Sequence, residues 1–284
     1  MQYMWIILVL FYGVSKGLRE TMKKIAMQKS SLMEVLFFHS LFAFISIIPT
    51  VKDVLNIPTV FYLLIFLKSF VVFLAWILSF KSIRKLPISS YGIIDVSGVV
   101  FSTLMGVFLL NEDIYRNNVI GLVLVVFGLY LVNSKKRTRS DTSDSDPRYI
   151  FLALAACLLN SVSGTLDKIY TNYVTPGQLQ FWFMLFMVIL YILYMISTKS
   201  SVSIKSAAKN YWIIILSVLF VVADRALFMA NSDPNSKVSV MILLKQSCVI
   251  VNIILWKLVF KEKNILFKLF CSFIIIFGIL LAVI

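Results

Sequence analysis

The chain alternates long apolar runs with short clusters of charged and turn-forming residues. Each run approaches the roughly 20 residues that an α-helix needs to cross the hydrocarbon core of a bilayer. The pattern therefore predicts an all-α integral membrane protein with ten transmembrane helices. Their expected ranges are 3–24, 32–51, 59–82, 87–110, 116–133, 149–171, 177–197, 210–230, 236–259 and 264–284.

The two halves of the chain carry the same landmarks in the same order. A shift of 144 residues aligns Thr21, Lys24, Ile25 and Phe37 with Thr165, Lys168, Ile169 and Phe181. A shift of 150 residues aligns Glu112, Phe127 and Gly128 with Glu262, Phe277 and Gly278. Each half holds five predicted helices, and an odd number places the second copy upside down in the membrane. We predict two inverted five-helix repeats, at 1–133 and 149–284, joined by a polar linker at 134–148.

Composition narrows the class of protein. The chain is 60% hydrophobic and 14% charged, which leaves too little polar surface for a soluble domain. Its net charge of +14 comes from basic residues between the apolar runs, which fits loops beside anionic lipid and argues against nucleic acid as a partner. One histidine, three cysteines without metal spacing and no H-E-x-x-H motif indicate no metal, no cofactor and no intramembrane enzyme.

A polar stripe lies on one face of the predicted fourth helix and has a counterpart in the ninth. In the fourth helix it consists of Tyr91, Asp95, Gly98 and Ser102. The shift of 150 residues brings Lys245 opposite Asp95, and Asn252 opposite Ser102. Charges inside a bilayer are costly and mark solute pathways or structural pairs. We expect the two stripes to line a shared cavity, and a purely structural Asp95–Lys245 ion pair is the alternative.

Further charges in the runs extend the candidate site. Lys16 lies deep in the first helix. Asp224 and Arg225 are adjacent in the eighth helix and therefore point in different directions. We expect one of the two to pair with Lys245 and the other with a neighbour or the solute.

The remaining polar positions leave alternatives open. Lys68 has no obvious partner in sequence, while Lys23 and Asp167 are expected near a membrane interface, where snorkelling makes charges inexpensive. His39 is either a packing residue or a pH-sensitive group in the cavity. Trp76 could join other aromatic residues in a cage for an organic cation, but such residues are also common in bundle cores.

The segment 86–132 contains a recurring motif. An apolar run ends at Glu112, and the next run carries Gly121 and Gly128, two helical turns apart. Two glycines on one helix face permit close helix packing. Glu112 precedes a helix, whose amino-terminal dipole would favour a carboxylate; a gate or proton site is the alternative.

This motif resembles that of the EamA-type ten-helix members of the drug/metabolite transporter superfamily. The second half repeats it with Glu262 and Gly278, although Cys271 stands where the first glycine is expected. The position of His39 resembles one where relatives often carry an arginine near the cavity. The resemblance extends over both halves and implies a transporter fold without naming the solute.

These observations predict a secondary transporter that moves a small polar metabolite, zwitterionic or anionic, by alternating access. The absence of a nucleotide-binding loop from the sequence points to proton coupling or exchange. The alternative is a non-transporting membrane scaffold or a lipid-carrier translocase subunit. The expected partners are the solute, membrane lipid and a coupling proton, with the chain a monomer or homodimer in a bacterial cytoplasmic membrane.

The orientation in the membrane has two conflicting indications. Basic residues gather in the odd-numbered connections, which predicts that these face the cytoplasm and that both termini lie outside. The resemblance implies cytoplasmic termini instead.

Overall fold

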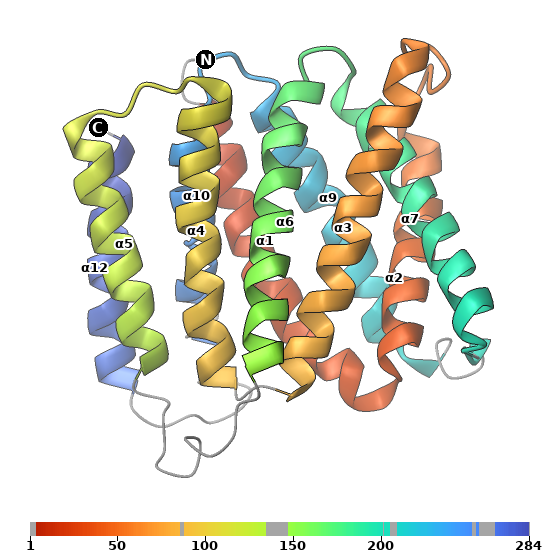
Figure 1. Ribbon diagram of the computed structural model, residues 1–284, viewed down its shortest axis with the longest axis horizontal. Helices are drawn as coiled ribbons and strands as arrows, with labels where there is room; N and C mark the ends of the chain where they lie inside the picture. Colours follow the sequence, from red (N-terminus) through yellow and green to blue (C-terminus); the bar gives the residue numbers. More distant parts are fainter. Residues whose placement is uncertain are drawn as a thin grey trace. The chain divides into compact units, whose positions relative to one another are not determined.

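The computed structural model describes residues 4–85, 88–134, 147–200, 202–204, 209–251, 254–255 and 265–283. All regular structure within these ranges is helical (Figure 1). The helices are α1 (Met4–Lys29), α2 (Leu32–Ile47), α3 (Thr59–Lys85), α4 (Ile88–Leu110), α5 (Arg116–Ser134), α6 (Pro147–Tyr170), α7 (Pro176–Thr198), α9 (Tyr211–Asn231), α10 (Val238–Lys245) and α12 (Ile265–Val283). A short 3-10 helix, η1 (Ile48–Thr50), follows α2.

The helices begin where the apolar pattern predicts, to within two residues. α1 continues five residues beyond its predicted end, whereas α10 ends at Lys245 and a turn at Gln246 and Ser247 separates it from 248–251. Among the described residues, five helical segments are long and apolar enough to cross a membrane: Leu32–Thr50, Thr59–Ser79, Pro147–Tyr170, Pro176–Thr198 and Tyr211–Asn231. Shorter apolar helices occupy Ile94–Leu110, Arg116–Leu131, Val238–Val251 and Phe270–Ala282.

The chain forms two compact units, and each draws helices from both predicted repeats. Unit 1 comprises Met1–Phe73 and Asp167–Pro234, and unit 2 comprises Leu74–Leu166 and Asn235–Ile284. Their boundaries fall inside α3 and α6. Most of the predicted linker, residues 135–146, lies outside the described residues.

In unit 1, α2 and α7 begin with the same capping box. The Ser31 hydroxyl accepts a hydrogen bond from Glu34 N (3.3 Å), and the Glu34 carboxylate accepts one from Ser31 N (2.9 Å). The Thr175 hydroxyl and the Gln178 side chain make the same reciprocal bonds, at 3.3 and 3.0 Å. Both capping residues are 144 positions apart, which is the shift that aligns the first parts of the two predicted repeats.

The side chains of Glu34 and Gln178 also bind the loops that follow α7 and α2, respectively. Glu34 accepts a hydrogen bond from Ser203 N (3.1 Å), after α7. Gln178 donates to the carbonyl oxygens of Asp53 (2.9 Å) and Asn56 (3.0 Å), after α2. α2 packs on α7, and α1 packs along α9. The start of α2 thus contacts the loop after α7, and the start of α7 contacts the loop after α2.

In unit 2, α5 and α12 lie side by side and antiparallel (Figure 1). A Cβ atom at Gly121 would come within 2.5 Å of the carbonyl oxygen of Gly278. One at Gly128 would come within 2.7 Å of Ile275 and 3.3 Å of the Cys271 carbonyl oxygen. The predicted role of Gly121 and Gly128 in close helix packing is therefore confirmed.

Glu112 caps a different helix from the one expected. It does not serve α5, the next helix in sequence; its carboxylate accepts hydrogen bonds from Val238 N and Ser239 N (2.9 Å) at the start of α10. The Ser239 hydroxyl donates to the same carboxylate at 2.6 Å. Glu112 N in turn donates to Gly106 O (3.2 Å), so the chain after α4 turns back and directs the carboxylate to α10. Its predicted counterpart, Glu262, lies outside the described residues.

Candidate functional site

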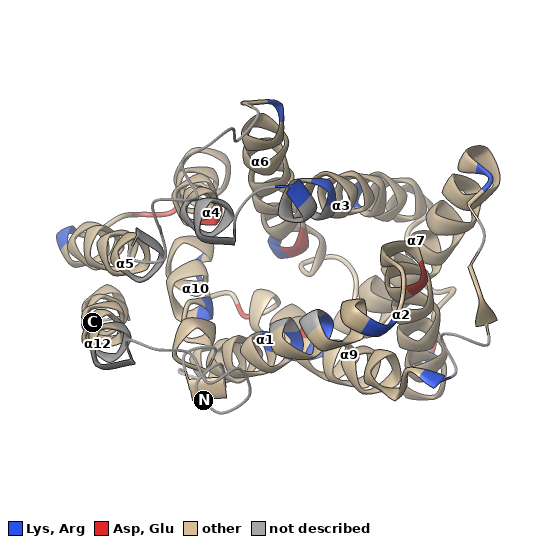
Figure 2. Cartoon of the chain, turned by 90° about the horizontal axis from the view of Figure 1, so that it is seen from below, with Lys and Arg blue, Asp and Glu red and all other residues tan. Residues whose placement is uncertain are grey.

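Buried ionisable side chains gather in unit 1, although charged residues are sparse along the helices as a whole (Figure 2). They are Arg19, Glu34, His39, Lys68, Asp167 and Asp224. Among the side chains whose exposure is described in unit 2, no Asp, Glu, Lys or Arg is buried. Since burying a charge costs free energy unless it is paired, these positions define the candidate site.

Lys68 and Asp167 form the tightest ion pair. Lys68 Nζ lies 2.5 Å from Asp167 Oδ1, and only 1% of Lys68 is exposed. The ammonium also lies 3.9 Å from the ring centre of Phe183 and 4.8 Å from that of Phe228. The position of Asp167 near a membrane interface stays a prediction, because burial within the protein does not give depth in a bilayer. Asp167 is buried because α6 brings it against Lys68, for which the sequence offered no partner.

Arg19 and Asp224 form a looser ion pair between α1 and α9. Arg19 Nη1 lies 3.9 Å from Asp224 Oδ1. The guanidinium stacks over the rings of Phe220 (4.8 Å) and Tyr12 (5.2 Å). Asp224 thus pairs with Arg19 inside unit 1. Lys245 belongs to unit 2, and its expected pairing with Asp224 or Arg225 stays a prediction.

His39 lies in the middle of α2 and is buried against α9. Its Nδ1 lies 3.1 Å from Ser217 Oγ, and its ring meets Phe220 edge-on at 5.0 Å. Ser217 also donates to the His39 carbonyl oxygen (3.1 Å). This geometry favours the packing interpretation of His39 over the pH-sensing one.

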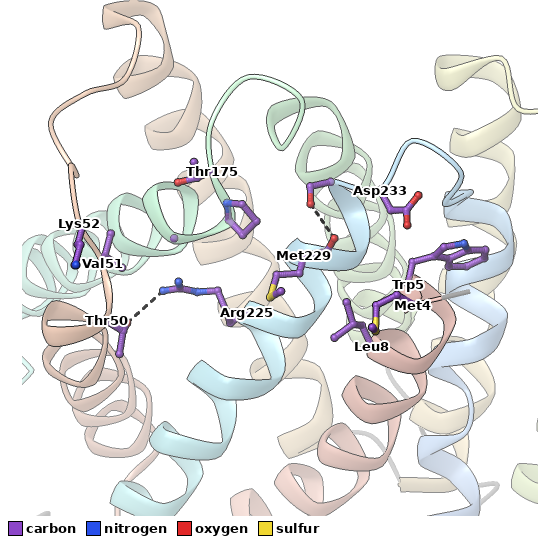
Figure 3. Close-up of a pocket in the computed structure, with 13 residues that line it drawn as sticks. Met4, Trp5, Leu8, Thr50, Val51, Lys52, Thr175, Arg225, Met229 and Asp233 are labelled. Carbon is purple, nitrogen blue, oxygen red and sulfur yellow. Dashed lines mark hydrogen bonds between the residues drawn. The ribbon is translucent and has the colours of Figure 1, made fainter. Parts of the chain in front are cut away.

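An open pocket of about 630 Å³, which we call the vestibule, lies at one end of unit 1 (Figure 3). It is bounded by the amino-terminal ends of α1 and α7, the carboxyl-terminal end of α9 and the segment after α2. Its lining residues are Met4, Trp5, Leu8, Thr50, Val51, Lys52, Thr175, Pro176, Gly177, Arg225, Met229, Ser232 and Asp233. Such a volume is typical of small-molecule sites.

Arg225 connects the vestibule with the buried pairs. It follows Asp224 on α9, and while Asp224 faces Arg19, Arg225 lines the vestibule. Its Nε donates to Gln180 Oε1 at 2.6 Å, and its Nη2 lies 3.4 Å from Thr50 Oγ1. The expectation that Asp224 and Arg225 point in different directions is confirmed.

The stripe on α4 lies in unit 2 and faces α6. Asp95 is exposed, with the Cys157 thiol 3.8 Å from its Oδ1. Ser102 is buried and donates to Ser161 Oγ at 3.0 Å, and Ser161 lies 3.2 Å from Gly98 O. These hydroxyl contacts account for the burial of Ser102, so it makes a helix–helix contact.

The other predicted site residues are spread over both units. Lys245 ends α10, which packs on α4, and is partly exposed. Trp76 on α3 in unit 2 and Lys16 on α1 in unit 1 are also partly exposed. The side chain of Tyr91 and the whole of Asn252 lie outside the described residues. Membership of one solute site remains a prediction for all of these positions.

Several contributors were not among the predicted site residues, including Lys68, Gln180 and Gly177. Lys68 is an isolated charge in an apolar run, which in itself calls for a buried partner. Gln180 is wholly buried in α7, in the otherwise apolar stretch that follows its first turn. A polar residue there indicates an interhelical hydrogen bond, whereas nothing local to Gly177 indicates a role.

The chain is similar to a transporter family in part of its sequence and to solved structures in its fold. A model of the EamA-like transporter family matches residues 3–134. No curated protein matches the chain in sequence. Among 29 solved chains that match in structure, one described only as "Crystal structure of protein" has a TM-score of 0.74 at 13% identity. The match covers 98% of this chain and 95% of that chain, and it shows a shared fold alone.

Proposed function

Because a model of the EamA-like transporter family matches residues 3–134, we propose that the chain is a secondary carrier for a small polar metabolite that works by alternating access. The family match and the apolar helices support a multi-pass membrane protein of the drug/metabolite transporter superfamily. The solute, the mechanism and the coupling belong to the proposal.

The paired charges inside span-length helices carry the proposal. Lys68, Asp167 and Asp224 lie in helices apolar enough to cross a membrane. Each costs roughly 2.5–3.5 kcal/mol at the centre of a span, so a protein retains them where they serve a solute or ion pathway. Of these three residues, Asp224 lies on α9, whose carboxyl-terminal end bounds the vestibule.

Inverted repeats with ten spans are part of the proposal, and the contacts within each unit support them. A two-fold relation between equivalent segments makes contacts occur in exchanged pairs. Glu34 and Gln178 make such an exchange with the loops after α7 and α2. The contact of Gly121 with Gly278 and the contact of Gly128 with Cys271 form a second exchanged pair. The shift of 150 residues aligns Gly121 with Cys271 and Gly128 with Gly278. Inverted repeats are typical of secondary transporters.

The solute and its coupling follow from the charges. Unit 1 contains both basic side chains and carboxylates, in its two ion pairs and in the vestibule lining. This combination favours a zwitterionic or anionic solute over a bulky cation. Protons or exchange supply the driving force, and Lys68–Asp167 and Arg19–Asp224 are the groups to test for it. Asp95 and Lys245 on the packed helices α4 and α10 remain candidates for the central solute site.

The proposed setting is a bacterial cytoplasmic membrane, with lipid around a monomer or homodimer. The loops that bound the vestibule carry few basic residues, and this charge bias supports an external position for the vestibule. A C-terminal reporter active only in the cytoplasm tests this orientation, since activity of the reporter would reverse it.

Counterflow in proteoliposomes tests the function. The purified chain is reconstituted and assayed with labelled leucine, spermidine, glucose, uridine and glucose 6-phosphate, one representative of each solute class. We expect counterflow for leucine or glucose 6-phosphate, and its loss in Asp224→Asn, Asp95→Asn and Lys245→Ala. The exposed Lys199→Ala is the matched control.

Absence of counterflow for every class would overturn the carrier and favour the scaffold or translocase-subunit alternative. Full activity after exchanging Asp95 and Lys245 with each other would make that pair structural. Full activity in all single variants would remove these residues from the site.

A further inference from the structure

The guanidinium of Arg225 is held in one orientation at the wall of the vestibule. Gln180 accepts its Nε–H at 2.6 Å, and Gln180 itself is fixed because its Nε2 donates to Val221 O at 2.7 Å. Gln180 is 0% exposed, so this amide has one arrangement that satisfies both bonds. A guanidinium whose Nε edge is bound presents its two terminal nitrogens outward.

The space beside Arg225 depends on a glycine. A Cβ atom at Gly177 would lie 3.0 Å from Arg225 Nη1, which is closer than side chains ordinarily pack. On the other side, Thr50 gives its own proton to Ile47 O (2.7 Å), so its oxygen accepts from Arg225 Nη2 at 3.4 Å. Within the described part of the chain, Gln180 and Thr50 engage two of the guanidinium's five N–H groups. The other three have no hydrogen-bond acceptor there.

The rest of the vestibule suits a small organic acid. Lys52 adds a second positive charge to the lining, and the amino-terminal end of α7 contributes its positive dipole. Arg225 and Thr50 lie toward one end, whereas Met4, Trp5 and Leu8 from α1 lie toward the other (Figure 3). One end therefore offers hydrogen-bond donors and positive charge, and the other offers apolar surface beside the Asp233 side chain (Figure 3).

We propose that the vestibule binds the carboxylate of a small, partly apolar acid through the terminal nitrogens of Arg225, with Gln180 and Gly177 as positioning residues. Arginine fits the planar carboxylate with two parallel hydrogen bonds, which a lysine cannot reproduce. The inference rests on the proposed carrier function and names the substrate class of its vestibule.

Ligand-dependent thermal unfolding of the full chain in detergent tests the site. The probes are leucine, 4-methylpentanoate, leucinamide and inorganic phosphate, which separate the carboxylate from the amine and from anions in general. Ligands that bind the folded state raise the unfolding midpoint with concentration. We expect stabilisation by leucine and 4-methylpentanoate, and none by leucinamide or phosphate.

The variants assign the effect to Arg225. Arg225→Lys should weaken binding of 4-methylpentanoate about tenfold, because the paired hydrogen bonds are lost. Arg116→Lys, the same exchange at an exposed position on α5, should change nothing. Gln180→Leu should weaken binding about fivefold in the parent and not at all in the Arg225→Lys background, which a general loss of stability would not reproduce.

Four results overturn the site: equal stabilisation by leucinamide, equal stabilisation by phosphate, parental affinity in Arg225→Lys, or no response of the parent to either acid. Counterflow separates this inference from the carrier function. An acid that binds through Arg225 but shows no counterflow overturns the carrier and leaves the site. Counterflow of the acid that Arg225→Lys leaves unchanged overturns the site and leaves the carrier.

Discussion

The two units of this protein hold their helices together by different means. In unit 1, α1, α3, α6 and α9 meet through ion pairs, Arg19–Asp224 and Lys68–Asp167, backed by aromatic rings. In unit 2, α5 meets α12 through Gly121 and Gly278, and α4 meets α6 through hydroxyl groups. Its described interior contains no buried charge.

The two units differ in whether their described interiors contain buried charges. Close packing through small residues is how helices associate in lipid without a hydrophobic driving force. Charges add cost rather than cohesion there, since burying an ion pair is often no more stable than packing apolar residues. The described interior of unit 2 is therefore held by packing and hydroxyl contacts, and its candidate solute residues Asp95 and Lys245 are not buried. Unit 1 instead retains buried charges that packing alone does not require.

The largest expected effect is at the tight ion pair of unit 1. Lys68→Met leaves Asp167 buried without its ammonium and should lower the free energy of unfolding by about 3–5 kcal/mol. Adding Asp167→Asn should restore most of this loss, because both charges are then gone. Unfolding in detergent measures both variants, with the exposed Lys199→Met as control. Equal loss in the single and double variants would contradict the pairing.

The next effect tests the packing of unit 2. Gly121→Ala places a Cβ atom 2.5 Å from the Gly278 carbonyl oxygen and should cost about 1–3 kcal/mol, because the helices must separate. Gly164→Ala is the matched control, since nothing lies within 4 Å of a Cβ there. It should be neutral or stabilising by about 0.5–1 kcal/mol, as alanine is the better helix former. Similar losses at both positions would disprove the close contact.

The Glu112 cap distinguishes a structural carboxylate from a gate. Glu112→Gln replaces one accepting oxygen with a donor facing the amino-terminal end of α10, and should cost about 1–2 kcal/mol. If the cap is purely structural, transport per folded molecule stays at the parental level. The neighbouring Asp113→Asn is the control, because its exposed side chain has no part in the cap and its backbone oxygen alone accepts from Lys237 (3.1 Å). A loss of transport without a loss of stability would favour the gate.

The smallest effect compares the two capping boxes of unit 1. Ser31→Ala and Thr175→Ala should each lower stability by about 1 kcal/mol, since each removes one side-chain cap. The exposed Ser197→Ala should have a smaller effect. Similar costs at both caps would support the equivalence of the helices, whereas a cost at one cap alone would argue against it.

Local pattern predicted the helices well because each apolar run is bounded by charged or turn-forming residues close to it in sequence. The starts of α2, α3 and α5 agree with the pattern residue for residue. The ends agree less well where polar residues continue a helix past its apolar stretch, as in α1, or where a turn interrupts it, as after Lys245.

The contact partners of individual side chains could not be predicted in the same way, because they lie on helices that are distant in sequence. Lys68 and Asp167 are 99 residues apart, one in each predicted repeat, and neither shift aligns them. Glu112 was assigned to the nearest helix start, but its loop turns it to α10. Gln180 and Gly177 acquire their roles only when α9 brings Arg225 against α7.

The exchanged contacts between α5 and α12 also have a consequence for ancestry. If two identical five-helix chains met through this interface, every substitution would enter it twice, once from each copy. In a single fused chain each position enters once, so Cys271 can lie opposite Gly128 while Gly278 stays opposite Gly121. Under the proposed inverted-repeat architecture, fusion into one gene would let each half diverge alone. One half can then acquire a carboxylate where the other acquires an amine, with the shared interface intact.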